Sequence, residues 1–165
     1  MRDCLLDTNI WSDWYKLDKN AYIIEKLKSI STARIHISEI SWGELCYGYE
    51  LLTQREKRKL GGILEFVTGL TPITLGINRH VSIEYGKLRA KLFNKYAPGK
   101  LRKKGMRPHE LTDPCTDKQL QIQENDLWIA SQAIIYDLGL VTNDKMNAIK
   151  EIAGKSFHIE NWAAS

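Results

Sequence analysis

The chain has 165 residues, of which 43% are hydrophobic, and this size suits a single domain with a substantial core. Its apolar runs are far shorter than the roughly 18 residues of a membrane span, and its first residues form no signal-peptide core, so we expect a cytoplasmic protein with no membrane partner. The three cysteines, Cys4, Cys46 and Cys115, are an odd number at wide spacings, which favours reduced thiols over disulfides or a metal pair.

Charge is distributed unevenly along the sequence. The net charge is +4, but the stretch from Lys87 to Arg107 holds nine basic residues and no acidic one, which leaves 15 basic against 20 acidic residues elsewhere. A basic stripe of this kind attracts polyanions such as nucleic acids. A solvated helix face that continues into a loop explains the same run equally well, so charge alone leaves both interpretations open.

The first half of the chain alternates predicted strands and helices. Residues 4–6 form a short apolar run that predicts a strand, and a helix follows it. A second helix is expected over 22–29, and 35–37 predict a strand whose following helix has Ser38 as its N-cap. Apolar residues between 55 and 67 have helical spacing, which predicts one further helix.

The middle of the chain combines a long helix with an irregular segment. Residues 73–75 predict a short third strand, and Asn78 is positioned to cap a helix whose apolar residues recur at helical spacing through Leu92. The segment 97–123 holds several prolines and glycines and no steady period, so we expect a long loop or insertion.

The last part of the chain returns to alternation. A helix is expected over 126–136 with Gly139 as its stop, and a strand over 140–142 follows. A weak helix near 146–152 and a short strand near 157–159 end the chain. Strands that alternate with helices predict an α/β fold with a mostly parallel sheet covered on both faces.

Four acidic residues occupy positions where they could meet. Asp7 and Asp144 directly follow predicted strands, Asp126 lies in the first turn of a helix, and Glu44 lies in the helix after 35–37. Ligand sites of open parallel sheets form at the carboxyl ends of the strands, so all four can point to one rim. Clustered carboxylates repel one another unless a hard cation neutralises them, which indicates a site for Mg²⁺ or Mn²⁺.

Each acid also has a purely structural alternative. Asp7 could cap the helix that follows it, and Asp126 could favour a helix dipole. Glu44 could form a capping box with Ser41, and Asp144 could close a turn after its strand.

Motifs of other enzyme classes are absent from the sequence. It has no Gly-rich phosphate-binding loop, no dinucleotide fingerprint, no zinc-protease helix and no nucleophile elbow. The histidines lack metal-ligand spacing and are expected to be structural or superficial: His36, His80, His109 and His158.

Four short motifs follow one another in chain order. They read LLDTNI at 5–10, ISEISWGELCYG at 37–48, ENDLWIA at 124–130 and LVTND at 140–144. Together they resemble the motifs of PIN-domain ribonucleases, in particular the VapC toxins of bacterial toxin–antitoxin pairs. The closing IENW at 159–162 also resembles the end of these toxins.

The resemblance implies a fold, an activity and partners. The fold would be a three-layer α/β/α sandwich with a short, mostly parallel central sheet, in a single domain over residues 1–165. The activity would be Mg²⁺-dependent cutting of structured RNA such as tRNA or rRNA, with Mn²⁺ able to substitute, by a homodimer that a cognate antitoxin blocks. The implied metal-binding and catalytic acids are Asp7, Glu44, Asp126 and Asp144. The implied supporting residues are Thr8, Asn9, Thr142 and Asn143.

One segment departs from this pattern, because residues 95–123 are longer than the short basic connection that usually precedes the third motif. We expect this insertion to grip RNA phosphates beside the metal site. The candidate RNA-binding residues are Arg89, Lys100, Arg102, Lys103, Lys104 and Arg107, of which 102–104 are called the basic triplet below.

Two other functions and one surface remain open on the sequence alone. The chain could be a catalytically silent PIN-like module that binds RNA or protein, or a PIN nuclease of RNA processing that has no antitoxin. Four aromatic residues could contribute either to the core or to a dimer or antitoxin groove: Trp11, Trp14, Trp42 and Tyr49.

Overall fold

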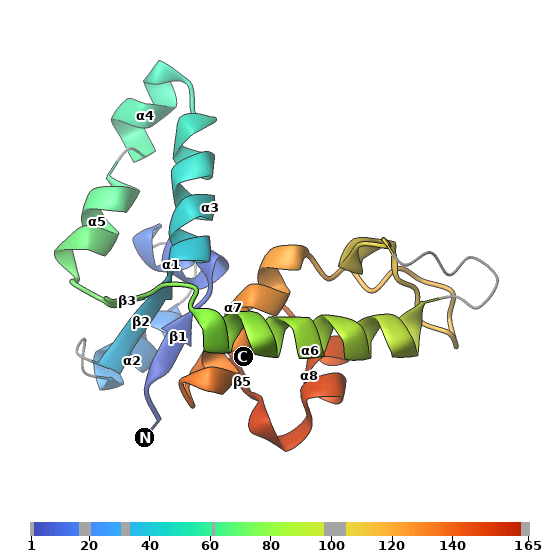
Figure 1. Cartoon of the computed structure of the whole chain (residues 1–165). Coiled ribbons are helices and arrows are strands. Elements are labelled where there is room, and N and C mark those ends of the chain that lie inside the picture. Colours follow the sequence, from blue (N-terminus) through green and yellow to red (C-terminus); the bar gives the residue numbers. More distant parts are fainter. Residues whose placement is uncertain (1, 17–20, 31–33, 61, 98–104, 163–165) are drawn as a thin grey trace.

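The computed structural model describes residues 2–16, 21–30, 34–60, 62–97 and 105–162. In these ranges, five parallel strands form one sheet in the order β3-β2-β1-β4-β5 (Figure 1). The strands are β1 (Cys4–Leu6), β2 (Ile35–Ser38), β3 (Ile73–Leu75), β4 (Gly139–Thr142) and β5 (His158–Asn161).

Helices cover both faces of the sheet, which confirms the predicted three-layer α/β/α architecture (Figure 1). The first face is covered by α1 (Thr8–Tyr15), α2 (Ala21–Ser29), α3 (Glu39–Glu50) and α5 (Ile63–Gly69), and α4 (Gln54–Leu60) lies beyond the sheet near the far end of α3 (Figure 1). The second face is covered by α6 (Arg79–Tyr96), α7 (Glu124–Ile135) and α8 (Asn147–Ala153). Short 3₁₀ helices are η3 (Pro108–Glu110) and η4 (Gly154–Ser156). No helix within the described ranges is long and apolar enough to cross a membrane.

The central strand β1 explains why both faces need a cover. Successive side chains of a strand point to opposite faces, and all three residues of β1 are buried. Leu5 packs in the core with α6, α7 and α8, whereas Cys4 and Leu6 pack in the core with α1 and α2. The apolar run at 4–6 therefore supplies both hydrophobic cores at once.

Two predicted helix caps are confirmed. The Ser38 Oγ accepts a hydrogen bond from the Ile40 backbone N–H at 3.0 Å at the start of α3. The Asn78 Oδ1 accepts one from the Val81 backbone N–H at 3.0 Å at the start of α6. Each cap satisfies a backbone donor that has no partner within its helix.

The prediction of one helix between 55 and 67 is wrong. The chain forms two helices there, since α4 ends at Leu60 and α5 begins at Ile63 with Gly62 as its N-cap. Glycine is among the weakest helix formers, so Gly62 marks the break in a periodicity that otherwise continues across it.

The predicted helix stop at Gly139 is also wrong. Helix α7 ends at Ile135, and Asp137 adopts a left-handed conformation with φ 52°. The Leu138 N–H then donates to the Ala133 carbonyl at 2.9 Å, and the Asp137 N–H donates to the Ile134 carbonyl at 3.3 Å. This Schellman arrangement closes the helix without a glycine, which leaves Gly139 as the first residue of β4.

The described part of the insertion, 105–123, folds back onto the core. It contains η3 and an antiparallel bridge between Thr112 and Gln119. Leu111 and Ile122 are buried in the core that α6 and α7 share.

Candidate functional site

Asp7 lies where β1 ends and α1 begins. Its backbone N–H donates to the Val141 carbonyl of β4 at 2.9 Å, and its Oδ1 accepts from the Thr8 N–H at 2.8 Å as the N-cap of α1. Its side chain is almost fully buried, with 5% of the residue exposed. The capping role is therefore present, and it fixes the carboxylate at the carboxyl edge of the sheet.

Thr142 and Asn9 connect Asp7 to Asp144. The Thr142 Oγ donates to Asp7 Oδ2 at 2.7 Å and accepts from the Asp144 backbone N–H at 3.0 Å. The Asn9 Nδ2 donates to Asp7 Oδ2 at 3.3 Å and to Asp144 Oδ2 at 3.0 Å. The Asn143 N–H donates to Asn9 Oδ1 at 3.2 Å. Three of the four predicted supporting residues, Asn9, Thr142 and Asn143, therefore connect the ends of β1 and β4.

Glu44 reaches the same rim from α3. Its carboxylate accepts hydrogen bonds from the Thr8 hydroxyl and from the Asn125 side-chain amide, the latter at 2.7 Å. The alternative of a capping box with Ser41 is wrong, because α3 begins after Ser38 and the buried Ser41 hydroxyl has no hydrogen-bond partner among the described residues.

Asp126 is the third residue of α7, and its Oδ2 accepts from the Gln123 backbone N–H at 2.7 Å. Burial, against the lowering effect of the hydrogen bond from the Gln123 N–H and together with the negative charges of Asp7, Asp144 and Glu44, raises the pKa of Asp126 to about 6. The pKa of Asp7 is raised chiefly by burial, against the lowering effect of its hydrogen bonds from Thr142 and Thr8. The four acids therefore share one electrostatic environment.

Two cavities open beside the acids. The larger, of about 690 Å³, is lined by Asp126 and Asp144 and by residues 113–123 and the start of α8. The second, of about 610 Å³, is lined by Arg89, Arg107 and the beginning of α7.

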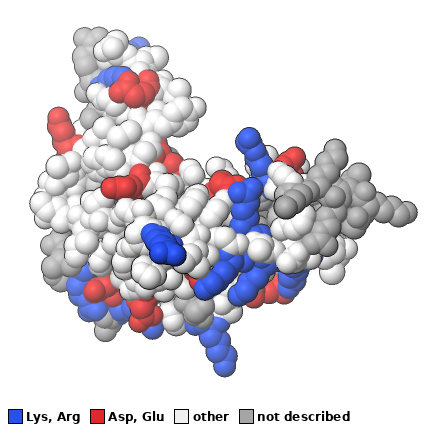
Figure 2. All heavy atoms as spheres, in the orientation of Figure 1, with Lys and Arg blue, Asp and Glu red and all other residues white. Residues whose placement is uncertain are grey.

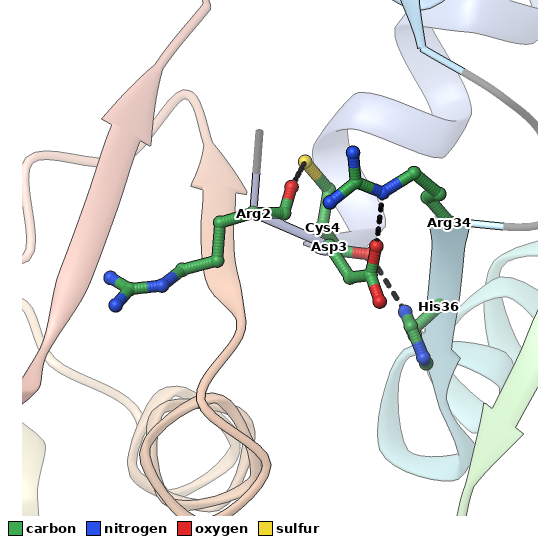
Figure 3. Close-up of polar contacts among 5 residues, drawn as sticks. All are labelled: Arg2, Asp3, Cys4, Arg34 and His36. Atoms are coloured by element: carbon green, nitrogen blue, oxygen red, sulfur yellow. Dashed lines mark hydrogen bonds and ion pairs between the residues drawn. The ribbon is translucent and has the colours of Figure 1, made fainter.

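Another polar cluster lies at the opposite, amino-terminal ends of β1 and β2 (Figure 3). There Arg34 forms an ion pair with Asp3, and the buried His36 ring contacts the Cys4 carbonyl at 3.3 Å. The Cys4 thiol lies 3.6 Å from the Arg2 carbonyl, and burial raises its pKa to about 11. A thiol in this state is protonated at neutral pH and is no nucleophile.

Comparison with known proteins decides the family. The PIN-domain sequence pattern matches residues 4–155. The chain belongs to the PIN-domain family. No curated protein sequence matches it closely enough to add to this result.

Solved structures with this fold confirm the predicted resemblance to VapC-type PIN toxins. VapBC2 from Rickettsia felis, bound to a DNA fragment from its promoter, is 25% identical, with a TM-score of 0.68 and coverage of 96% of this chain and 98% of that chain. DNA-bound VapBC from Salmonella typhimurium is 26% identical, with a TM-score of 0.65 and coverage of 98% and 99%. FitAcB from Neisseria gonorrhoeae is 22% identical, with a TM-score of 0.71 and coverage of 98% and 99%.

The acidic cluster of this PIN domain suits a divalent cation. None of the four acids forms an ion pair with Lys or Arg in the described part of the chain, so their charge is balanced only by hydroxyl, amide and backbone donors. Within the described ranges, no three acidic, histidine or cysteine side chains converge tightly enough to form a ready-made metal cage. Mg²⁺ typically binds through one or two carboxylates and keeps several waters, which such an open cluster accommodates.

Sequence reasoning missed three residues of the site. Asn125 holds Glu44, Gln123 holds Asp126 through its backbone, and Asp13 accepts from the Asn143 Nδ2 at 2.6 Å. Asn125 lies inside the third motif, so its position beside an acid was a usable signal.

The predicted RNA-binding residues have different surroundings. Figure 2 shows Lys and Arg side chains gathered over α6. Arg89 is already engaged, since its guanidinium contacts Glu124 at 2.8 Å and the Tyr85 hydroxyl at 2.6 Å. Arg107 is exposed beside the second cavity, whereas Lys100 and the basic triplet lie outside the described residues.

The four aromatic candidates divide between core and surface. Trp11 is fully buried, so it takes the core alternative and cannot line an open groove. Trp14 stacks on Trp11 with ring centroids 5.6 Å apart, and Trp42 packs against the same core. Tyr49 is half-buried under the Lys57 ammonium, which lies 4.6 Å from its ring centroid.

Proposed function

We propose that this PIN domain is a Mg²⁺-dependent endoribonuclease that cuts structured RNA, such as tRNA or rRNA, as the toxin of a toxin–antitoxin pair. The observation that carries the proposal is the set of four carboxylates at one rim of the sheet with no cationic side chain paired to them among the described residues. Proteins rarely tolerate such a cluster except where a divalent cation completes it.

Asp7, Asp126 and Asp144 are the proposed ligands, and Glu44 completes the acidic pocket. When bound, Mg²⁺ or Mn²⁺ supplies positive charge that offsets the charge developing on the phosphodiester and makes a nearby water more acidic. The chain itself orients the acids, because Thr142 holds Asp7 while its hydroxyl accepts from the Asp144 backbone.

The remaining supporting residues set the spacing between the acids. Asn9 spans Asp7 and Asp144 with one amide group, and Thr8 joins the helix after β1 to Glu44 on α3. Asn143 holds Asn9 in place through its backbone N–H. This network fixes carboxylates from three elements before any ion binds, which lowers the cost of organising the site.

The proposed grip on RNA combines the exposed Arg107 with Lys100 and the basic triplet, and Arg89 adds charge although it is paired. Guanidinium and ammonium groups bind phosphate oxygens without regard to sequence. Arg89 and Arg107 line the second cavity together with Asn125, whose side chain holds Glu44, and this position favours contact with phosphates that flank the cut.

A cognate antitoxin and a homodimer are the proposed protein partners. The matched VapBC and FitAcB structures are toxin–antitoxin assemblies, and this chain shares their fold over nearly its full length. Apolar side chains at the C-terminal end of α3 suit such a partner, since Tyr47 and the C-cap residue Leu51 are each 67% exposed.

Expression in a bacterial host tests the function as a whole. Induction of the wild-type chain should stop growth and produce discrete RNA fragments, whereas Asp7→Asn should do neither. Asp117→Asn is the matched control, because it removes one carboxylate at an exposed position outside the acidic cluster and should behave like wild type. Growth arrest by a folded Asp7→Asn protein would contradict the proposal.

A further inference from the structure

The 690 Å³ cavity is a cleft that extends away from the acidic cluster. Asp126 and Asp144 lie in its wall at the acidic end, and residues 113–123 and the start of α8 form its sides. Cavities of roughly 300 to 1,000 Å³ are the usual size of sites for small organic groups. A nucleotide adjoining the bond to be cut would therefore fit beside the acids.

The insertion gives this cleft a fixed wall. The Leu120 N–H donates to the Leu111 carbonyl at 3.0 Å, and Thr112 pairs with Gln119 in an antiparallel bridge. Leu111 and Ile122 are buried in the core, which anchors both sides of this hairpin. The backbone that carries the side chains of this wall is therefore held in place, which fixes where those side chains enter the cleft.

The sequence Gln-Leu-Gln-Ile-Gln at 119–123 places amides on one side of that wall. Gln119, Gln121 and Gln123 are exposed and line the cleft, whereas Ile122 is buried. Gln121 adopts φ 57°, a left-handed conformation that is uncommon for residues other than glycine. Strained backbone positions concentrate at binding sites, where the surroundings hold them.

The start of α8 also brings a left-handed residue and a side-chain amide to the cleft. Met146 adopts φ 41° immediately before α8, and Asn147 lines the cleft next to it. Among the described residues, no side-chain hydrogen bond engages the amides of Gln119, Gln121 or Asn147. Their donors and acceptors are thus available to a ligand.

The charge of the cleft selects the kind of ligand. Asp113 and Glu151 line its sides in addition to the two acids, and only Lys118 and Lys145 oppose them, so the excess of negative charge disfavours a phosphate that is not neutralised. A carboxamide offers one donor group and one acceptor, which matches the edge of a nucleobase. Bases in duplex RNA are hidden from such contacts, whereas unpaired bases present their edges.

On the basis of the proposed nuclease function, we infer that this cleft binds one unpaired nucleobase next to the scissile phosphate and that Gln119, Gln121 and Asn147 select it. The insertion would then set sequence preference, while the basic residues of the second cavity contribute affinity. These two contributions can be separated experimentally because they depend on different side chains.

The test uses a pool of RNA hairpins whose unpaired loop has a randomised sequence. The full-length wild-type protein cuts the pool in Mg²⁺, and sequencing of the product ends should show a base preference at one fixed position from the cut. The double variant Gln121→Ala/Asn147→Ala should lower that preference about tenfold. Gln54→Ala is the matched control, because it truncates an exposed glutamine on α4 outside the cleft and should retain the wild-type preference.

A second readout separates this inference from the nuclease proposal. The same substitutions in an Asp7→Asn background are tested for base preference in binding to the pool, and thermal melting verifies their folding. Cutting without any preference, or with a preference that the double variant keeps, would overturn the inference and leave the nuclease standing. No cutting but a binding preference that the double variant loses would support base recognition and reject the nuclease.

Discussion

Replacing Asp126 with asparagine should stabilise the ion-free protein while it damages the proposed site. The pKa of Asp126 rises from 3.8 to about 6, because burial and the neighbouring carboxylates disfavour its charged form. The folded state therefore holds the proton more tightly than the unfolded state does. The ionised carboxylate destabilises the fold fully above pH 6, and this penalty disappears as the pH falls toward 3.8.

The size of this effect follows from the shift. At 1.36 kcal/mol per pKa unit, the ionised Asp126 lowers the free energy of unfolding by roughly 3 kcal/mol at most. Solvent screening of a half-buried group reduces this loss to about 1–2 kcal/mol. Asp126→Asn keeps an oxygen that can accept from the Gln123 N–H. The melting temperature at pH 7.5 in EDTA should therefore rise by about 2–6 °C for a domain of this size.

Thermal unfolding between pH 4.5 and 7.5 measures the effect. The gain of Asp126→Asn over wild type should shrink as the pH falls, and Mg²⁺ should stabilise wild type more than the variant. Asp117→Asn should show no such pH-dependent gain, because it removes a charge from an exposed position. A variant less stable than wild type in EDTA, or a gain that does not change with pH, would refute this electrostatic reasoning.

Three further changes have defined outcomes. Thr142→Val removes the hydroxyl that holds Asp7, so RNA cleavage on product gels should fall at least tenfold. The free energy of unfolding, measured in urea, should fall by about 1–3 kcal/mol. Unchanged cleavage would show that this hydroxyl does not position the acid. Alanine replacement of the basic triplet, 102–104, should weaken RNA binding and reduce the slope of log affinity against log salt by about 2–3, and an unchanged affinity would remove the triplet from the RNA surface. A thiol reagent at pH 8 should label the exposed Cys115 well before Cys4, whose pKa is about 11; mass spectrometry would contradict this if Cys4 reacted first.

The arrangement of the acids was predictable because it depends on strand ends. Asp7 and Asp144 each follow a short apolar run, and β1 and β4 turn out to be neighbours in the sheet. Parallel strands bring their carboxyl ends to one edge, so the positions sufficed without the strand order. The fold class followed from the same alternation of strands and helices.

The contacts that hold the acids were less accessible from sequence. Thr8 meets Glu44 across 36 residues, and Asn125 meets it across 81, so neither contact produces a local pattern. Local patterns also failed where backbone conformation decided the outcome. Asp137 ends α7 by adopting a left-handed conformation, although a glycine two residues later offers the more common signal.

The insertion was the least predictable part, because its structure depends on tertiary contacts. Leu111 and Ile122 are isolated apolar residues in a polar stretch, and only the core between α6 and α7 gives them a common partner. The alternation of glutamines at 119–123 resembles a strand, yet the segment forms a single bridge rather than a strand of the sheet.

The central claim is that the four acids form a metal-dependent RNA-cutting site, and cleavage of purified total RNA tests it most directly. Wild-type protein freed of any partner should yield discrete products in Mg²⁺, none in EDTA, and full activity again when Mg²⁺ is restored. A folded Asp7→Asn protein should yield none under any of these conditions, whereas Asp117→Asn should match wild type. Cutting that persists in EDTA, or in Asp7→Asn, would contradict the account.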